Sequence, residues 1–225
     1  MTYMIRTSKN VGPAVISSRN QVIPMKKPFV TLEQLQAITA QYPTPFHLYD
    51  EKGIRENARR LKEAFAWNPG FKEYFAVKAT PSPAILKILH EEGCGTDCSS
   101  LTELMMSDRC GFHGSEIMFS SNDTPAEEFV LADQLGATIN LDDFTHIDFL
   151  KETIGHIPET ISCRYNPGGT FSIGASKEGF QVMDNPGEAK YGFTRAQLTE
   201  GFRKLKEMGA KHFGIHAFLA SNTLS

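Results

Sequence analysis

The pattern of apolar and polar positions predicts short strands that alternate with amphipathic helices. The strand segments are rich in β-branched and aromatic residues and are bounded by Gly, Pro, Asn or Asp. The helical segments repeat apolar residues at three- or four-residue spacing, as in Leu198, Phe202 and Leu205. We expect six strands of one sheet, which end near Lys78, Cys98, Ser120, Leu141, Tyr165 and Leu219.

Local signals mark where the helices begin. Thr31 and Thr194 each stand three residues before a Gln, and Ser100 stands three residues before Glu103, which is the spacing of a capping box. Pro83 suits the first turn of the helix that follows the Lys78 segment. A further helix is expected from residue 143.

The repeated strand–helix order predicts a parallel α/β sheet, either a barrel or a doubly wound fold. No G-x-G-x-x-G follows a strand, which argues against dinucleotide binding. Residues 1–45 read as an N-terminal extension with one helix, and residues 46–225 as a separate barrel domain. The short strand at 46–49 falls outside the six-strand series.

Lys78 closes the apolar segment 74–77, and Thr80-Pro81 follows at once. Pro81 cannot continue a ladder, so the strand is expected to end near Lys78. A lysine buried there can lose its proton, and its neutral amine can hold an aldehyde as a Schiff base. The alternative is a structural lysine whose stem is buried and whose charge reaches water.

Motifs at several separated points resemble the alanine-racemase-like (fold type III) enzymes that use pyridoxal 5'-phosphate (PLP). Within that group, the chain is most similar to the diaminopimelate decarboxylases. The motifs occur in the family's order, and they lie at residues 74–81, 93–104, 118–122, 164–167, 190–193 and 214–216.

The resemblance implies a (β/α)8 barrel, of which the chain contains about six of the eight strands. It also implies that the family's C-terminal β-rich domain is missing, so the chain is expected to be a fragment that is inactive alone. Lys78 would bind PLP, and Asp97 would lie beside it and orient an amine or guide protons. Asp97 could instead cap a helix, and Arg164 could orient an active-site group or form a structural ion pair.

The sixth strand departs from the family pattern. Diaminopimelate decarboxylases commonly have His-Ile-Gly-Ser where this chain has Phe218-Leu219-Ala220-Ser221. By resemblance, Phe218 would stack on the PLP ring and Ser221 would help to hold the phosphate. A phenyl ring can stack but offers no proton, so His216, two residues earlier on the same strand face, is the candidate proton carrier.

The function implied by the resemblance is PLP-dependent decarboxylation of meso-2,6-diaminopimelate to L-lysine, in lysine biosynthesis, by a cytoplasmic homodimer. Another decarboxylase of the group, acting on carboxynorspermidine or a basic amino acid, stays open. So do a non-catalytic single-barrel PLP carrier and a barrel that only binds a partner. Alanine racemase fits less well, because Thr80-Pro81-Ser82 does not match its motif.

Composition narrows these classes only slightly. The chain has 225 residues, is 40% hydrophobic and carries a net charge of -3. It therefore lacks the net positive charge that favours binding to nucleic acid or an anionic membrane. No apolar run approaches the length of a membrane helix. The four cysteines suit a reducing cytoplasm, and their spacing favours packing in strands over a metal site.

Overall fold

The computed structural model describes residues 2–5, 15–16, 22–23, 27–168 and 191–218. The chain forms two compact units, Met1–Phe71 and Lys72–Ser225. The predicted division at residue 45 stays a prediction. The elements of the first unit are β1 (Thr2–Ile5), β2 (Val15–Ile16), β3 (Val22–Ile23), α1 (Leu32–Gln41), β4 (His47–Asp50) and α2 (Glu51–Ala64).

In the described part of the first unit, the strands form two separate pairs. β1 and β4 form a parallel pair, and β2 and β3 form an antiparallel pair. The strand expected at 46–49 is therefore present as β4, and it lies outside the large sheet as predicted.

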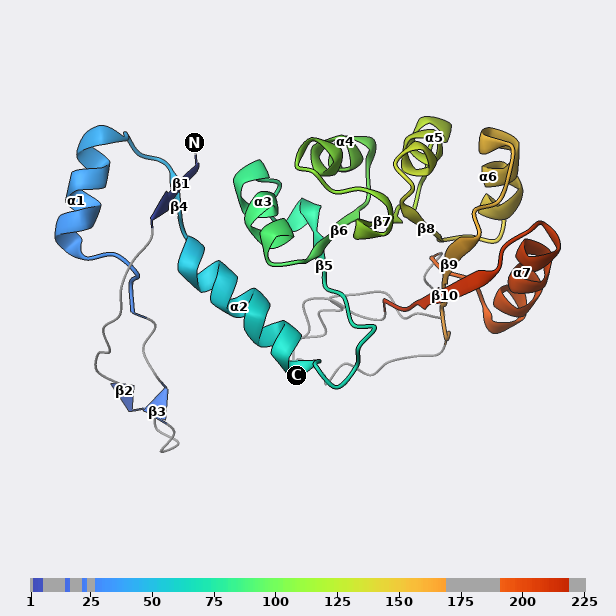
Figure 1. The fold of residues 1–225 in the computed structure, drawn as a ribbon, viewed down its shortest axis with the longest axis horizontal. Coiled ribbons are helices and arrows are strands. Elements are labelled where there is room, and N and C mark those ends of the chain that lie inside the picture. The colour runs from blue at the N-terminus through green and yellow to red at the C-terminus, as the bar shows by residue number, and fades with distance from the viewer. Residues whose placement is uncertain (1, 6–14, 17–21, 24–26, 169–190, 219–225) are drawn as a thin grey trace, which may run out of the picture. The chain divides into compact units, whose positions relative to one another are not determined.

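The second unit is built on a six-stranded parallel sheet with the order β10-β9-β8-β7-β6-β5 (Figure 1). This confirms the predicted α/β fold with six of the barrel strands, and the sheet does not close on itself. The strands are β5 (Tyr74–Ala76), β6 (Gly95–Cys98), β7 (Ile117–Ser120), β8 (Thr138–Leu141), β9 (Thr160–Arg164) and β10 (His212–His216).

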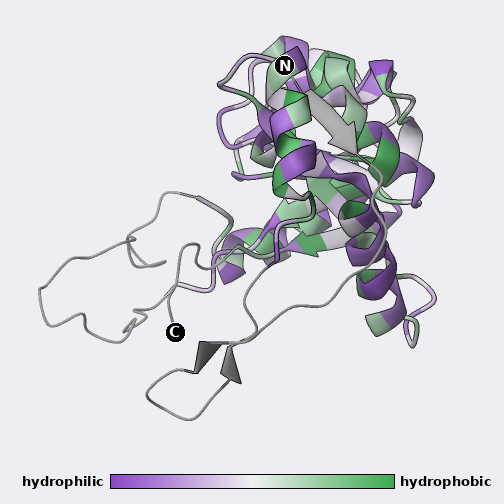
Figure 2. Ribbon diagram, turned by 90° about the vertical axis from the view of Figure 1, so that its left-hand side faces the viewer, coloured by the Kyte–Doolittle hydropathy of each residue, from purple (hydrophilic) through white to green (hydrophobic). Residues whose placement is uncertain are grey.

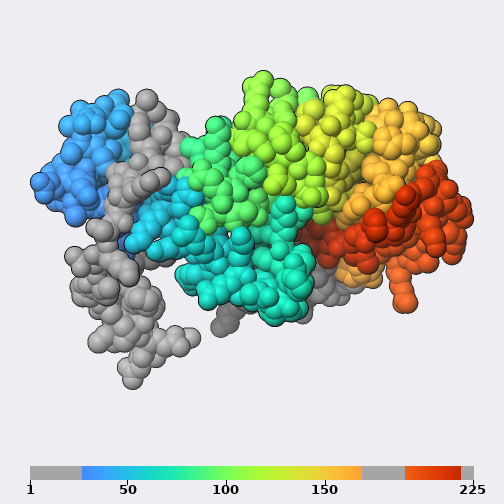
Figure 3. All heavy atoms as spheres, in the orientation of Figure 1, coloured from blue at the N-terminus to red at the C-terminus, as the bar shows by residue number. Residues whose placement is uncertain are grey.

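Helices connect the strands of the second unit. Four of them, α3 to α6, follow one another along one side of the sheet (Figure 1) and pack into a continuous surface (Figure 3). The helices are α3 (Pro83–Glu91), α4 (Leu101–Arg109), α5 (Ala126–Gln134), α6 (His146–Ile154) and α7 (Arg195–Glu207), with 3-10 turns η1 (Val77–Ala79) and η2 (Gly114–Glu116).

The two faces of the sheet differ in polarity because side chains alternate along each strand. The helix-covered face carries apolar side chains that are fully buried, namely Cys98, Ile117, Phe119, Ile139, Leu141, Ile161 and Cys163. The alternate positions line a cavity on the other face and are polar except for Met118. In Figure 2 the helices carry hydrophilic residues beside hydrophobic ones, as helices with one face on a core do.

The predicted helix starts are confirmed, with one shift. Complete capping boxes are present at Thr31 and Thr194, and Ser100 caps α4. Helix α6 begins three residues later than predicted. The reason is that the carboxylate of Asp143 accepts a hydrogen bond from the backbone N–H of Thr145 at 2.8 Å, which forms a turn before the helix.

The first barrel strand ends near Lys78 as predicted, but the expectation that Lys78 is buried is wrong. Strand β5 ends at Ala76, and Lys78 lies in the 3-10 turn η1 with an exposed side chain. The turn is closed by a hydrogen bond from Thr80 N to Val77 O at 3.1 Å. Val77, which is fully buried, occupies the core position beside the strand end.

All four cysteines are buried and have free thiols. Burial raises the pKa of Cys98 to about 11 and that of Cys163 to about 12, so both thiols stay protonated and act as packing groups. Separately, no helix in the described part of the chain combines the length and apolar character needed to cross a bilayer.

Candidate functional site

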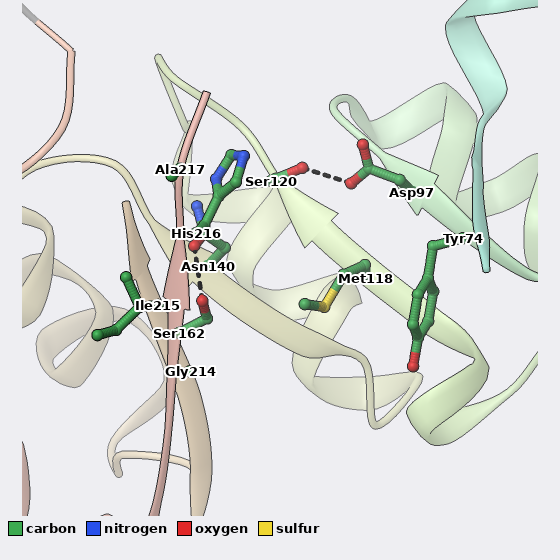
Figure 4. A pocket seen from close by; sticks show the side chains of 10 residues that line it. All are labelled: Tyr74, Asp97, Met118, Ser120, Asn140, Ser162, Gly214, Ile215, His216 and Ala217. Atoms are coloured by element: carbon green, nitrogen blue, oxygen red, sulfur yellow. Dashed lines mark hydrogen bonds between the residues drawn. The ribbon is translucent and has the colours of Figure 1, made fainter. Parts of the chain in front are cut away.

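The polar face of the sheet borders a cavity of about 380 Å³ in the second unit (Figure 4). All six strands contribute to its lining. Strand β5 contributes its first residue, and the other five strands contribute residues within them or directly after their C-terminal ends. The lining residues are Tyr74, Asp97, Met118, Ser120, Asn140, Ser162, Gly214, Ile215, His216 and Ala217. The carboxyl ends of parallel strands are where barrel enzymes place their catalytic groups, so this cavity is the candidate site.

Asp97 and Ser120 form a hydrogen-bonded pair in this cavity. The Ser120 hydroxyl donates to Asp97 Oδ1, across neighbouring strands β6 and β7 (Figure 4). Burial raises the pKa of Asp97, although the Ser120 hydrogen bond and the charges of Lys78 and His216 lower it. Desolvation is the largest effect, so Asp97 keeps its proton to a higher pH than an exposed aspartate.

His216 ends β10 and faces the same cavity. Burial is the main cause of its lowered pKa, and the Arg164 cation lowers that pKa further. The carboxylates of Asp97 and Asp142 act in the opposite direction. Its Nδ1 atom is buried and has no hydrogen-bond partner among the described residues. The imidazole is therefore held in its neutral form at neutral pH, able to accept a proton.

Lys78 lies close enough to act on both of these groups. Its positive charge lowers the pKa of Asp97 and that of His216. The structure thus brings together the three residues that the sequence singled out as catalytic, from η1, β6 and β10. The side chain of Lys78 is exposed, and Lys78 is not among the residues that line the cavity.

Arg164, at the end of β9, forms a buried ion pair. Its Nη1 lies 3.0 Å from Asp142 Oδ1, and the two side chains are 13% and 5% exposed. The guanidinium also lies over two aromatic rings, 5.3 Å from the centre of Tyr191 and 5.5 Å from that of Phe218. Such contacts hold a cation in place. Arg164 is thus paired with a carboxylate of this chain, that of Asp142.

Asp142 is the main site residue that the sequence did not single out. It directly follows β8, where a polar residue after a buried strand was the available signal. Its Oδ1 accepts from Arg164 and also from Asn122 Nδ2 at 3.3 Å. Neither partner is near it in sequence, so the pattern alone could not identify this role.

Gly192 allows the segment 191–193 to lie against the C-terminal ends of β8 and β9. Its N–H donates to the carbonyl of Asp142 at 2.9 Å, and its φ of 86° is in the left-handed region. A Cβ atom there would stand 3.1 Å from Asn166 N and 3.2 Å from Arg164 O. Glycine is therefore needed both for the backbone angle and for the close approach that places Tyr191 beside Arg164.

Asn140 and Ser162 add a second polar pair that the sequence did not single out. The Ser162 hydroxyl donates to Asn140 Oδ1 at 2.9 Å, and both side chains are buried in the cavity wall (Figure 4). Gly214 leaves room for Ser162, whose Cβ would be 3.1 Å from a Cβ at that position. Their alternation with buried apolar residues was the signal that could have shown them.

The remaining sequence-derived candidates are only partly placed. Phe218 is half exposed and contacts Arg164. Ser221 lies outside the described residues. Glu103 accepts from the backbone N–H of Ser99 at 2.9 Å and from the hydroxyl of Ser100 at 3.1 Å, which is the structural role expected of it.

Two curated proteins show what the chain is similar to. It is 39% identical over 191 residues to Protein TabA of Pseudomonas amygdali pv. tabaci, which covers 85% of this chain and 43% of that protein. It is 31% identical over 188 residues to a diaminopimelate decarboxylase of Thermoplasma acidophilum, covering 84% of this chain and 44% of the relative. The chain therefore spans less than half the length of these relatives.

A solved structure agrees with the sequence comparisons. The diaminopimelate decarboxylase of Helicobacter pylori, crystallised with L-lysine, superposes with a TM-score of 0.71 at 25% identity, over 85% of this chain and 48% of that one. Residues 51–223 match the family described as pyridoxal-dependent decarboxylase, pyridoxal binding domain. This match covers more than half of the chain, which therefore belongs to the pyridoxal-dependent decarboxylase family.

Proposed function

We propose that the complete protein containing these residues decarboxylates meso-2,6-diaminopimelate to L-lysine with PLP. The observation that carries the proposal is that Asp97 and His216 line a cavity of about 380 Å³ on the polar face of the sheet, and that the charge of Lys78 acts on both of them. Family membership supports the reaction type, and relatives named diaminopimelate decarboxylase support the substrate.

The described residues fit PLP. The cavity volume lies within the range of small-molecule sites, and its wall offers the hydroxyls of Ser120 and Ser162 and the amide of Asn140. The buried, unpartnered Nδ1 of His216 is available to a ligand atom. We propose that Lys78, Arg164 and Phe218 hold the cofactor together with Ser221. When bound, PLP supplies the electron sink that makes loss of CO2 feasible.

The chain's own groups bind, orient and move protons. The amine of Lys78 would hold the cofactor. Asp97, which accepts a hydrogen bond from Ser120, would orient that amine. His216 can accept a proton at Nδ1 and deliver it to the carbon that loses CO2, because burial and Arg164 keep the imidazole neutral beforehand. Phe218 offers a ring face and no proton.

The direct test is decarboxylation by the complete protein with PLP and meso-2,6-diaminopimelate, followed as CO2 release and L-lysine formation. We expect both products in equal amounts, and Lys78→Ala should abolish them. Lys87→Ala, which alters an exposed lysine on α3, is the matched control and should retain activity. Borohydride reduction should fix PLP to the peptide containing Lys78. Labelling at another lysine, with Lys78 unmodified, would refute the assignment.

A second candidate is a decarboxylase of the same family with another amino-acid substrate. Identity to Protein TabA, at 39%, exceeds the 31% to the Thermoplasma acidophilum diaminopimelate decarboxylase, and the name TabA specifies no substrate. The phenyl ring of Phe218 at a position where histidine is common also favours a changed site. Release of CO2 from carboxynorspermidine or a basic amino acid, but not from meso-2,6-diaminopimelate, would favour this candidate.

A further inference from the structure

The ion pair at the end of β8 and β9 has a geometry that calls for a role beyond stability. Asp142 is 5% exposed and Arg164 13% exposed by side chain, and the contact between them is 3.0 Å. A buried pair of this kind contributes little net stability compared with apolar residues of the same volume, because both charges are desolvated. The pair lies beside His216, which lines the cavity, because Arg164 and His216 are register partners on β9 and β10, and this position indicates a function in the chemistry.

Arg164 is restrained from several directions. Asp142 holds Nη1, and the rings of Tyr191 and Phe218 lie 5.3 Å and 5.5 Å from the guanidinium carbon. Asp142 itself is fixed by the amide of Asn122 at 3.3 Å. An arginine surrounded in this way is a fixed charge and not a mobile one.

Arg164, which carries this fixed charge, lies opposite His216 on the neighbouring strand. Arg164 and His216 are partners in the register of β9 and β10, and Tyr165 N donates to His216 O at 2.7 Å. We propose that Asp142 is a positioning residue of this site, whose carboxylate fixes the Arg164 guanidinium so that the imidazole of His216 faces one fixed cation and one fixed anion.

The charged groups around His216 come from four elements. They are Lys78 on η1, Asp97 on β6, Asp142 after β8 and Arg164 on β9. Lys78 and Arg164 disfavour the imidazolium, whereas the two carboxylates favour it. The Asp142–Arg164 pair thus contributes one charge of each sign to the surroundings of His216.

The test is an NMR titration of His216 in the complete protein without cofactor or substrate, with its signal assigned by its loss in His216→Gln. Arg164→Gln should raise the pKa of His216, and Asp142→Asn should lower it, each by roughly 0.5–1 pH unit for a unit charge at a partly buried site. Asp142→Glu, which keeps the charge, should stay near the wild-type value.

Asp148→Asn is the matched control. Asp148 belongs to a more exposed ion pair with Lys204 on α6 and α7, so its loss should leave the His216 titration unchanged. The guanidinium nitrogens give a second readout. Separate Nη signals of Arg164 are expected where Asp142 holds the group, and a single averaged signal in Asp142→Asn.

Asp142→Asn leaves a buried arginine unpaired and can fail to fold. In that case Asp142→Asn/Arg164→Gln, which removes both charges, is compared with Arg164→Gln, and the proposal requires the lower His216 pKa in the double variant. Equal values would overturn it. So would an Asp142→Asn protein that titrates like Asp148→Asn, or one whose shift has the same sign as that of Arg164→Gln.

This inference rests on the proposed function only in treating His216 as a reacting group. Because the titration and the guanidinium signals are read without PLP or amino acid, they can fail while decarboxylation succeeds. Equally, a protein that does not decarboxylate any substrate can still show the opposite shifts expected here. The two proposals are thus tested separately.

Discussion

Asp97 is the residue at which burial most clearly opposes charge in this site. Desolvation raises its pKa, and the hydrogen bond from Ser120 and the charges of Lys78 and His216 only partly offset that effect. A carboxyl group in this setting binds its proton more tightly in the folded protein than in the unfolded chain. Its contribution to stability therefore has the opposite sign to that of a salt-bridged aspartate.

We predict that Asp97→Asn flattens part of the pH dependence of stability. Between the ordinary value of 3.8 and the raised folded pKa, the native state binds more protons than the unfolded state, so the free energy of unfolding falls as pH rises. Urea denaturation at a series of pH values measures this. The free energy of unfolding of the wild type minus that of Asp97→Asn should decrease as pH rises across that window. Asp148→Asn is the control. A difference that is constant with pH would contradict the prediction.

Phe218 offers a separate test at the residue scale. If its ring stacks on the cofactor, Phe218→Ala should weaken PLP binding by roughly 1–3 kcal/mol, the range for aromatic stacking on a base. Phe218→His should restore binding, since imidazole also stacks. Fluorescence titration with PLP measures the affinity. Unchanged affinity in Phe218→Ala would mean that the ring serves only the Arg164 cation that it contacts at 5.5 Å.

At the scale of elements, local signals predicted what is locally determined. The capping boxes at Thr31 and Thr194 form as expected, because the residues that satisfy the first N–H groups of each helix lie within one turn. The parallel sheet followed from the repeated alternation with helices, whereas the choice of a barrel over a doubly wound fold came from the family resemblance. The Lys78 turn was missed because a strand and a 3-10 turn share the same apolar pattern over three residues.

The parts of the site that escaped prediction depend on contacts between elements. The role of Asp142 requires Arg164 and Asn122, which reach it from β9 and from the end of β7. The pair formed by Asn140 and Ser162 exists because β8 and β9 are in parallel register. No periodicity in one segment reports such pairs, whereas the family resemblance pointed to Lys78, Asp97 and His216.

The segment 191–193 gives an element-scale prediction. Gly192→Ala should lower the free energy of unfolding by more than Gly155→Ala. Both glycines have φ near +85°, so both variants bear a left-handed penalty of roughly 1–2 kcal/mol. Only at Gly192 does the new Cβ also meet backbone atoms, within 3.2 Å, and at Gly155 it meets nothing within 4 Å. Urea denaturation measures the free energy of unfolding of each variant. Equal losses in the two variants would show that the backbone around residue 192 moves away from the new Cβ atom.

At the scale of the whole molecule, the sheet has two edge strands in the described residues. Strands β5 and β10 each have one neighbour. On β10, Phe213 and Ile215 are 38% and 64% exposed. An unpaired parallel edge with exposed apolar side chains is a place where another strand can add.

We predict that residues 1–225 expressed alone are largely insoluble or molten and have no decarboxylase activity. Among the described residues, β10 has no further partner strand and its Phe213 and Ile215 are exposed, which is apolar surface that a stable domain buries. Sedimentation, dye binding and thermal melting measure this. A soluble monomer of residues 1–225 with a sharp cooperative melt and bound PLP would refute the prediction, and would favour a single-barrel PLP carrier.

The opposite chemistry of the two sheet faces has a consequence for how such a protein diversifies. Ser120, Asn140 and Ser162 point away from the helix-packed core, so their codons can change without disturbing the apolar layer that supports the fold, provided that Asn140 and Ser162 change together because each is the other's hydrogen-bond partner. A combinatorial library confined to these positions would sample new substrate preferences at a low cost in expressible protein. Deletion of one residue within a strand would instead exchange the two faces and eliminate both properties at once.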